Sequence, residues 1–206
     1  MKNIIIVGPS RSGKTTLAKR IHEELGCFVL STDKLVAVFQ NAYPQLDIRL
    51  NWDRDKTAEN LAPFLGHFLG TFSASDGRAL LDYSHGDVGE NRFVIEGAYF
   101  DFEKITQVLK SYNYNSLKEN FILIGLVQRE KKSEDFFNDF RKYDTDKDWT
   151  YHLSDEELRS VSEEAVTYNE SMDKELKKYR FKIYDTSHER DTVFDEILKK
   201  LKEEEV

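Results

Sequence analysis

Residues 8–15 read Gly-Pro-Ser-Arg-Ser-Gly-Lys-Thr, which is the full pattern G-x-x-x-x-G-K-[ST]. The apolar run 3–7 before it predicts a short buried strand, and the run 16–25 after it has the apolar spacing of a helix. Gly8 and Gly13 permit a tight curl in which backbone N–H groups converge on one anion. A strand, a glycine-containing loop and a helix in this order predict a phosphate-binding loop made of Gly8, Pro9, Ser10, Arg11, Ser12, Gly13, Lys14, Thr15 and Thr16.

Two side chains of this loop carry the expected chemistry. Lys14 is predicted to reach the β- and γ-phosphates of a bound nucleotide, and the Thr15 hydroxyl is predicted to bind Mg²⁺. The partial positive charge at the start of the following helix adds to the attraction for phosphate. A chance match to the pattern is the alternative, and the flanking strand and helix argue against it.

Composition and charge limit the classes of function. The chain has 206 residues, 39% of them hydrophobic and 33% charged, which favours one soluble globular domain spanning 1–206. A net charge of −8 argues against a nucleic-acid partner and against an anionic membrane surface. No stretch approaches the ~20 apolar residues that a membrane span needs, and the simplest placement is cytoplasmic. The one cysteine, Cys27, is interpreted as a buried small hydrophobe.

Further apolar runs alternate with helical patterns along the chain. Strands are expected at 27–31, 93–95, 121–127 and 181–184, which with 3–7 makes a parallel α/β sheet covered on both faces. The capping box that starts at Ser154 predicts a long helix ending near Tyr179, and a last helix is expected over about 190–201. Residues 34–90 have helical apolar spacing and are too many for a plain crossover, so we expect a substrate-binding helical insertion there. The polar, non-periodic residues around 129–153 are expected to form a lid.

Acidic residues follow two of the predicted strands. Asp33 follows the second strand, which we expect to neighbour the loop strand, and its carboxylate is suited to orient a substrate hydroxyl. The other interpretation is that Thr32 or Asp33 only caps the next helix. Glu96 follows the third strand and is a candidate to hold Mg²⁺ through water or to bind substrate. Its alternative is a strand-end carboxylate paired with a nearby lysine.

Basic residues of the lid are candidates to neutralise phosphate charge. Arg129 follows the fourth strand and Arg141 lies in the next helical segment, so either would contact phosphate if the lid closes over it. A solvated helix face is the competing interpretation of these charges. The turn 185–187 fits an adenine contact or plain helix capping, with a slight preference for capping.

Several aromatic and basic residues of the insertion are weaker candidates for a substrate pocket. Apolar residues at helical spacing usually belong to a core, whereas basic and indole side chains break that spacing. These candidates are Phe39, Tyr43, Arg49, Trp52 and Arg54.

With the loop, Asp33, Glu96 and the lid in view, the chain resembles the small-molecule kinase branch of the P-loop proteins. That branch includes nucleotide, shikimate and gluconate kinases and antibiotic phosphotransferases. The resemblance implies a three-layer α/β/α fold with a five-stranded parallel sheet of order 2-3-1-4-5, a helical insertion and a mobile lid. It also implies that Asp33 orients the acceptor hydroxyl and that Arg129 or Arg141 contacts phosphate.

The chain departs from the signatures of particular kinases. The segment Glu96-Gly97-Ala98-Tyr99 stands where adenylate kinases have Gly-Phe-Pro-Arg, and the Gly-Gly-Gly turn of shikimate kinases is missing. The Asp-Arg-Ser or Glu-Arg-Ser signature of deoxynucleoside kinases and the Asn-Lys-x-Asp motif of GTPases are also missing. These departures leave the acceptor open and favour ATP as the donor.

The sequence therefore predicts an ATP- and Mg²⁺-dependent kinase that acts on a hydroxyl or phosphate of a small metabolite, nucleoside or nucleotide. The alternative from another class is a nucleotide-binding regulatory protein with little turnover. A polynucleotide-end kinase is a third hypothesis, and the acidic balance argues against it. The oligomeric state, with a homodimer among the options, is left open.

Overall fold

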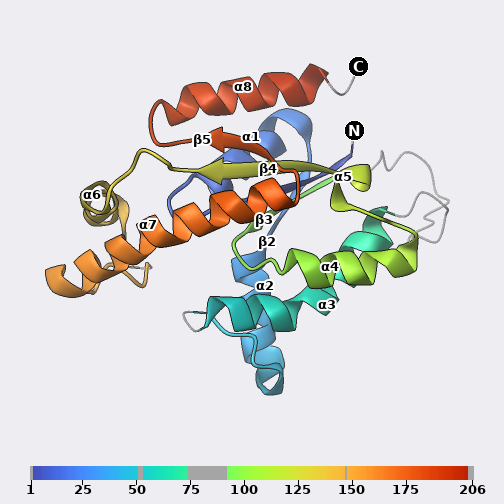
Figure 1. The fold of residues 1–206 in the computed structure, drawn as a ribbon, viewed down its shortest axis with the longest axis horizontal. Coiled ribbons are helices and arrows are strands. Elements are labelled where there is room, and N and C mark those ends of the chain that lie inside the picture. Colours follow the sequence, from blue (N-terminus) through green and yellow to red (C-terminus); the bar gives the residue numbers. More distant parts are fainter. Residues whose placement is uncertain (1, 51–52, 74–91, 147, 204–206) are drawn as a thin grey trace.

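The computed structural model describes residues 2–50, 53–73, 92–146 and 148–203. Its centre is an all-parallel sheet of order β2-β3-β1-β4-β5, as predicted (Figure 1). The strands are β1 (Asn3–Val7), β2 (Phe28–Ser31), β3 (Phe93–Gly97), β4 (Phe121–Val127) and β5 (Lys182–Asp185). All five lie within a residue or two of the ranges expected from their apolar runs.

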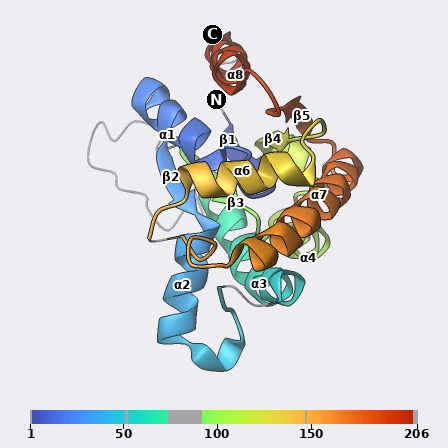
Figure 2. The same cartoon turned by 90° about the vertical axis from the view of Figure 1, so that its left-hand side faces the viewer.

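Helices cover both faces of this sheet (Figures 1 and 2). On one face lie α1 (Lys14–Leu25) and α8 (Arg190–Glu203), and on the other lie α3 (Arg54–Ser73), α4 (Phe102–Leu109) and α7 (Asp155–Lys178). The remaining helices are α2 (Thr32–Ala42), α5 (Leu117–Asn120) and α6 (Ser133–Tyr143), with single 3₁₀ turns at η1 (Pro44–Leu46) and η2 (Lys110–Tyr112). The three-layer architecture follows the prediction.

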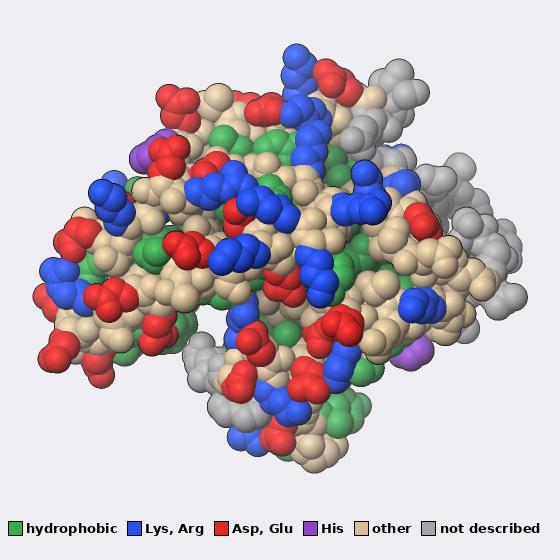
Figure 3. Space-filling view, viewed as in Figure 1, with side chains coloured by type: hydrophobic (Ala, Val, Ile, Leu, Met, Phe, Trp, Pro, Cys, Tyr) green, Lys and Arg blue, Asp and Glu red, His purple; other side chains and the backbone are tan. Residues whose placement is uncertain are grey.

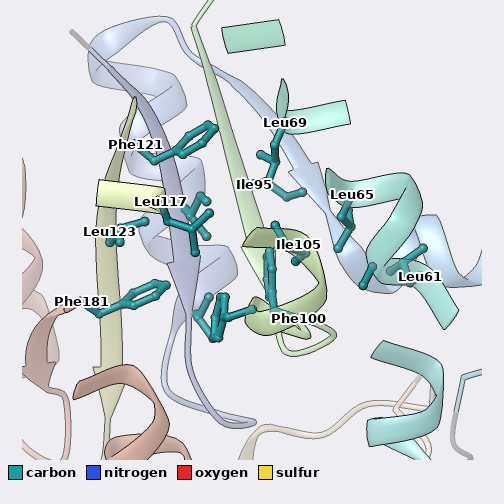
Figure 4. Packing of buried hydrophobic residues seen from close by; sticks show 14 of the residues in the cluster. Leu61, Leu65, Leu69, Ile95, Phe100, Ile105, Leu117, Phe121, Leu123 and Phe181 are labelled. Atoms are coloured by element: carbon teal, nitrogen blue, oxygen red, sulfur yellow. The ribbon is translucent and has the colours of Figure 1, made fainter. Parts of the chain in front are cut away.

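Two hydrophobic cores result from the alternation of side chains along the strands. In β1, Ile4 and Ile6 pack toward α1 and α8, whereas Ile5 and Val7 pack toward α3, α4 and α7. Figure 4 shows the core on the side of α3, α4 and α7, in which Leu61, Leu65 and Leu69 of α3 pack in one cluster with Ile95 of β3. Burial on both faces explains why the central strands read as continuous apolar runs.

The second strand differs from the prediction in two ways. β2 is an edge strand, with Phe28 63% and Val29 41% exposed, so it is not covered on both faces. It also lies next to β3 and not next to β1, which means that Asp33 follows a strand two places away from the phosphate loop. The sequence-based expectation that it neighbours the loop strand is wrong. Cys27 is fully buried just before the strand begins.

The predicted insertion contains α2, η1 and α3 as far as its residues are described, because 74–90 lie outside the described residues. The apolar face of α3 packs on α4, whereas Phe64 and Phe72 stay 39% and 48% exposed. Part of the helical apolar spacing therefore lies at the surface. The division of the chain into insertion and lid stays a prediction.

The helix that begins at the capping box has the expected limits. The Ser154 side chain accepts a hydrogen bond from the Glu157 backbone N–H, and the Glu157 side chain accepts one from Ser154 in return. Before it, α6 packs on α7 through a small cluster of Phe136, Phe140 and Leu158. Residues 144–146 and 148–153 lie between these two helices. Within the described residues, no helix combines the length and apolar character that crossing a bilayer requires.

Candidate functional site

The loop between β1 and α1 curls as its glycines predict. Gly13 has a φ of 91°, and Arg11 a φ of 63°. A methyl group on Gly8 would meet the Leu126 carbonyl oxygen at 2.4 Å, so only glycine fits this close approach to β4. Lys14 Nζ donates to the Pro9 carbonyl oxygen across the loop at 2.8 Å. Its ammonium group therefore lies at the mouth of the cradle that the loop amides form.

Polar side chains from other elements donate hydrogen bonds to backbone carbonyl oxygens of the loop. The buried Thr186 hydroxyl donates to the Ser12 carbonyl oxygen at 3.0 Å. In the amide orientation that satisfies both of its ends, the Gln128 side chain donates to the Ser10 carbonyl oxygen at 3.2 Å. Asp185 accepts from the backbone N–H and hydroxyl of Ser187 within the same turn. Thr186 thus fixes the loop, a role that neither the adenine nor the capping interpretation of 185–187 included.

A cavity of about 350 Å³ opens in front of the loop at the carboxyl ends of the strands. It collects most of the residues that the sequence singled out, although they come from distant segments. Its lining consists of Ser10, Arg11, Gly13, Lys14, Thr15, Thr16, Asp33, Glu96, Phe140, Asp148, Trp149, Thr150 and Arg190. The loop, both predicted acids and the end of the predicted lid therefore share one cavity.

Glu96 is the most buried acid of this cavity, with 2% of its surface exposed. Its Oε1 accepts a hydrogen bond from the Thr15 hydroxyl at 3.3 Å. Burial raises the pKa of Glu96, while the nearby Lys14 ammonium and hydrogen bonds from Ser31 and Thr15 act in the opposite direction. Burial likewise lowers the pKa of Lys14, and the charges of Glu96 and Asp33 oppose that shift. The charge of each group therefore opposes the pKa shift that burial causes in the other.

Gly97, directly after Glu96, shows how closely β2 and β3 approach at this end. It has a φ of 150°, and an added methyl group would come within 1.8 Å of the Thr32 hydroxyl. This requirement for glycine seats the end of β3 against the start of α2. Glu96 is thereby held in line with Ser31, its register partner on β2.

Asp33 lies in the first turn of α2 and is exposed. The N-cap of α2 is Ser31, and no side chain makes a capping hydrogen bond there. The structure therefore does not give Asp33 the capping role, and Asp33 lines the cavity. An acid in this position can accept a hydrogen bond from a ligand.

The oxygens of Thr15 and Glu96 fit a magnesium ion. A hydroxyl and a carboxylate 3.3 Å apart are the hard oxygen donors that Mg²⁺ prefers, and the ion ordinarily keeps several waters besides. Their place beside the phosphate loop would put the ion against the phosphates of a bound nucleotide. Either direct or water-mediated contact with Glu96 is compatible with this donor set.

Neither predicted lid arginine reaches the cavity in this structure. Arg129 forms an ion pair with Asp173 of α7 at 2.7 Å, and Arg141 forms one with Asp155 at 2.6 Å. Two other arginines line the cavity: Arg11 of the loop itself and Arg190 at the start of α8. Arg190 was missed as a site residue because its sequence context is that of an ordinary helix start.

The predicted lid segment contributes one acid, Asp148, to the lining of the cavity. Arg11 forms ion pairs with Asp144 and, at 3.6 Å, with Asp148 of the turn after α6. Asp144 also accepts a hydrogen bond from Thr150. These contacts hold the turn against the phosphate loop, so that Trp149 and Thr150 close one side of the cavity.

A second cavity of about 290 Å³ lies beside the first, among α3, α7 and the segment after β3. Val7 and Ala98 line it, and these residues directly precede the loop and follow Gly97. Arg54 also lines it, and its guanidinium lies 3.9 Å from the ring centre of Tyr168, whose buried hydroxyl has no hydrogen-bond partner in the described part of the chain. The half-buried Glu175 faces the same space, and burial raises its pKa.

Of the weaker candidates for a substrate pocket in the insertion, one lines a cavity and three do not. Arg54 lines the second cavity, whereas Phe39 packs edge-to-face on Phe64 at 4.9 Å. Tyr43 is 51% exposed, and Arg49 pairs with Asp47 on the surface. None of these three lines either cavity. Trp52 lies outside the described residues.

Comparison with known proteins agrees with this arrangement at the level of the fold. A family model described as "AAA domain" matches residues 4–72, which include the loop. No curated protein matches the chain. A solved shikimate kinase from Acinetobacter baumannii in complex with shikimate aligns with a TM-score of 0.54 and 16% identity, over 100% of this chain and 96% of that chain.

Two further solved structures align more loosely. A putative kinase from Chloroflexus aurantiacus gives a TM-score of 0.48 at 17% identity, covering 98% of this chain and 97% of that chain. A deoxyadenosine kinase from M. mycoides with bound dATP gives 0.44 at 15% identity, covering 98% and 100%. The strand order, the loop and the likeness to shikimate kinase define the class of fold as that of the P-loop kinases. At 16% identity this likeness is one of fold.

Proposed function

We propose that this protein is an ATP- and Mg²⁺-dependent kinase that transfers the γ-phosphoryl group to a hydroxyl or phosphate of a small metabolite, nucleoside or nucleotide. The observation that carries the proposal is the meeting of Lys14, Thr15, Asp33 and Glu96 around one cavity. Phosphoryl transfer needs positioning and charge neutralisation more than covalent chemistry, and these groups supply both.

Each residue has a distinct part in the proposed reaction. The loop amides and Lys14 hold the donor phosphates, and Thr15 with Glu96 would hold the metal. When bound, Mg²⁺ would neutralise developing charge on the phosphate oxygens. Asp33 accepts a hydrogen bond from the acceptor hydroxyl and turns its oxygen toward the γ-phosphate. Arg11 and Arg190 add positive charge, and Arg129 and Arg141 are proposed to contribute only if the lid rearranges.

The second cavity is the proposed acceptor pocket. It begins at Val7 and Ala98, next to the residues that line the nucleotide cavity, so a small acceptor in it would lie near the transferred phosphoryl group. Its charged lining consists of the cations Arg54 and Lys178 and the acids Asp55, Asp101, Glu103 and Glu175. This mixed lining suits a polar acceptor that carries several hydroxyl groups.

An ATP-consumption screen with nucleosides, nucleotides, sugar acids and amino sugars tests the proposal. For the acceptor found, Asp33→Asn is expected to lower kcat by at least about 10²-fold with little change in ATP affinity, the size of loss seen for a positioned acid–base group. Asp47→Asn is the matched control, because this exposed acid pairs only with Arg49 far along the insertion. Its kcat is expected to stay at the wild-type value.

The regulatory alternative predicts a different outcome of the same screen. It is favoured if no acceptor is phosphorylated while ATP binds with micromolar affinity and changes the oligomeric state. An acceptor that is turned over equally well by wild type and Asp33→Asn would remove the role assigned to this carboxylate.

A further inference from the structure

The amino end of β4 has an uncovered edge, at the opposite end of the sheet from the phosphate loop. β4 pairs with β1 from Phe121 onward, but it pairs with β5 only from Ile124 onward. The first three residues of β4 therefore have no strand partner on the β5 side. The Phe121 N–H is already bound to the Leu117 carbonyl oxygen, and the backbone groups that stay unpaired at such an edge are a template for another strand.

The end of α7 explains why this edge is left open. The Phe181 N–H donates to the Leu176 carbonyl oxygen, the Arg180 N–H donates to that of Lys177, and Arg180 has a φ of 62°. This is a Schellman motif, in which the last turn of a helix is closed by the residues that follow it. Because those backbone groups are bound to α7, they are not offered to β4, and β5 begins only at Lys182.

A cavity of about 800 Å³ lies over this edge. Phe121 and Leu123 of β4, together with Phe181, form its apolar floor. Figure 4 shows that these side chains are anchored in the core between the sheet and its helices, and each is at least nine-tenths buried. The floor is therefore part of the folded core, and its shape does not depend on exposed side chains.

The rim of this cavity is basic. Lys2, Lys118, Arg180 and Lys182 line it, and no acidic residue does. None of the four forms an ion pair within the described part of the chain, although the protein has a net charge of −8. In Figure 3, Lys and Arg side chains on this side of the molecule lie interspersed with Asp and Glu side chains. Four cations around a strand edge attract an acidic ligand, although Lys182 also lies close enough to Glu196 to lower the pKa of that acid.

We propose that this groove binds an extended acidic segment of a partner protein, which adds a strand to the open edge of β4. The backbone of that segment would supply the missing hydrogen bonds, and its acidic side chains would lie among the four cations. A single-stranded nucleic acid fits less well, because such ligands stack their bases on exposed rings, and Phe121 and Phe181 are only 2% and 6% exposed. The proposal is independent of the kinase reaction.

Selection of displayed random seven-residue peptides on the full-length protein tests the proposal. We expect enrichment of sequences with acidic residues at alternate positions and without proline. For a selected peptide, fluorescence anisotropy should show at least about a tenfold loss of affinity in the double variant Lys118→Glu/Lys182→Glu, because two favourable charge contacts become repulsive. Both positions are exposed, so the fold should tolerate the changes.

Two controls separate the proposed contact from general charge attraction. Lys174→Glu/Lys199→Glu makes the same change in net charge on other exposed positions and should leave the affinity unchanged. A peptide with N-methylated backbone amides keeps its charges but cannot pair as a strand, and it should lose binding. The proposal is overturned if no acidic peptide is enriched, if the two double variants bind alike, if the methylated peptide binds equally, or if oligo-dT competes with the same dependence on Lys118 and Lys182.

Discussion

Glu96 joins the proposed metal chemistry to an unusual electrostatic setting. A carboxylate with 2% of its surface exposed is costly to ionise, and the pKa of Glu96 is accordingly raised above the ordinary value of 4.5. The stability contributed by such a group is present below pH 4.5 and is lost as the pH rises through its folded pKa. A bound cation would favour the charged form, so the free protein holds this acid at an energetic cost that metal binding would offset.

This view predicts the titration of Glu96. Its side-chain carboxyl carbon, followed by ¹³C NMR, should titrate above pH 4.5 in the free protein and at a lower pH once Mg²⁺ and a non-hydrolysable ATP analogue are added. Glu157 is an internal control, since hydrogen bonds from Ser154 lower its pKa, and ligand should leave it unchanged. A Glu96 signal that titrates at or below 4.5 in the free protein would contradict this description of the site.

Some site residues could be predicted from the sequence, and others could not. The positions of the loop, Asp33 and Glu96 follow from local patterns, because glycine requirements and polar strand ends leave marks in the sequence. The ion-pair partners of arginines cannot be predicted from local patterns. Arg129 and Arg141 pair with acids of α7, and no residue near either arginine in the sequence indicates these partners. For the same reason Arg190 and the bond from Thr186 to the loop appeared only in three dimensions.

At the scale of elements, one buried polar side chain adds hydrogen bonds to the hydrophobic packing of α7 on the sheet. Asn169 accepts a hydrogen bond from the Gln128 N–H at 2.8 Å and donates to its carbonyl oxygen at 3.1 Å. Gln128 follows β4 directly, and its side chain lies against the phosphate loop. The position of α7 is thus coupled to the shape of the loop through two consecutive contacts.

Replacing Asn169 by alanine should therefore cost both stability and nucleotide affinity. Two buried backbone groups of Gln128 would lose their partner, which is expected to lower the free energy of unfolding by about 1–3 kcal/mol in urea titrations. Ser162→Ala is the control, because this buried hydroxyl of the same helix bonds only to the Leu158 carbonyl oxygen of that helix. Equal losses of stability in the two variants would show that Asn169 does not fasten α7 to the sheet.

The positions of helices and strands that depend on local sequence patterns were predictable, but which strands pair with each other was not. The capping box placed the start of α7, and continuous apolar runs placed the strands, because both depend on residues close in sequence. The mistaken neighbourhood of β2 arose because apolar runs do not specify which strands pair. The exposure of Phe28 and Val29 could not be predicted either, since an edge strand can be as apolar as a central one.

At the scale of the whole molecule, the nucleotide cavity, the proposed acceptor pocket and the proposed peptide groove occupy different places on one scaffold. The first two lie at the carboxyl ends of the strands, where parallel sheets ordinarily bind ligands, and the third lies at the amino ends. The resemblance stated from the sequence gave the strand order correctly. The proposed acceptor pocket is built from side chains of α3, α7 and the segment after β3, which no contiguous motif encodes.

Isothermal titration calorimetry with Mg²⁺ and ATP on the folded chain tests the central claim most directly. We predict heat from one site per chain with micromolar affinity, loss of that heat in Lys14→Ala, and its retention in Lys19→Ala, an exposed lysine of the same helix. Absence of heat with both ATP and GTP, or unchanged binding in Lys14→Ala, would contradict the assignment of residues 8–16 as a nucleotide phosphate site.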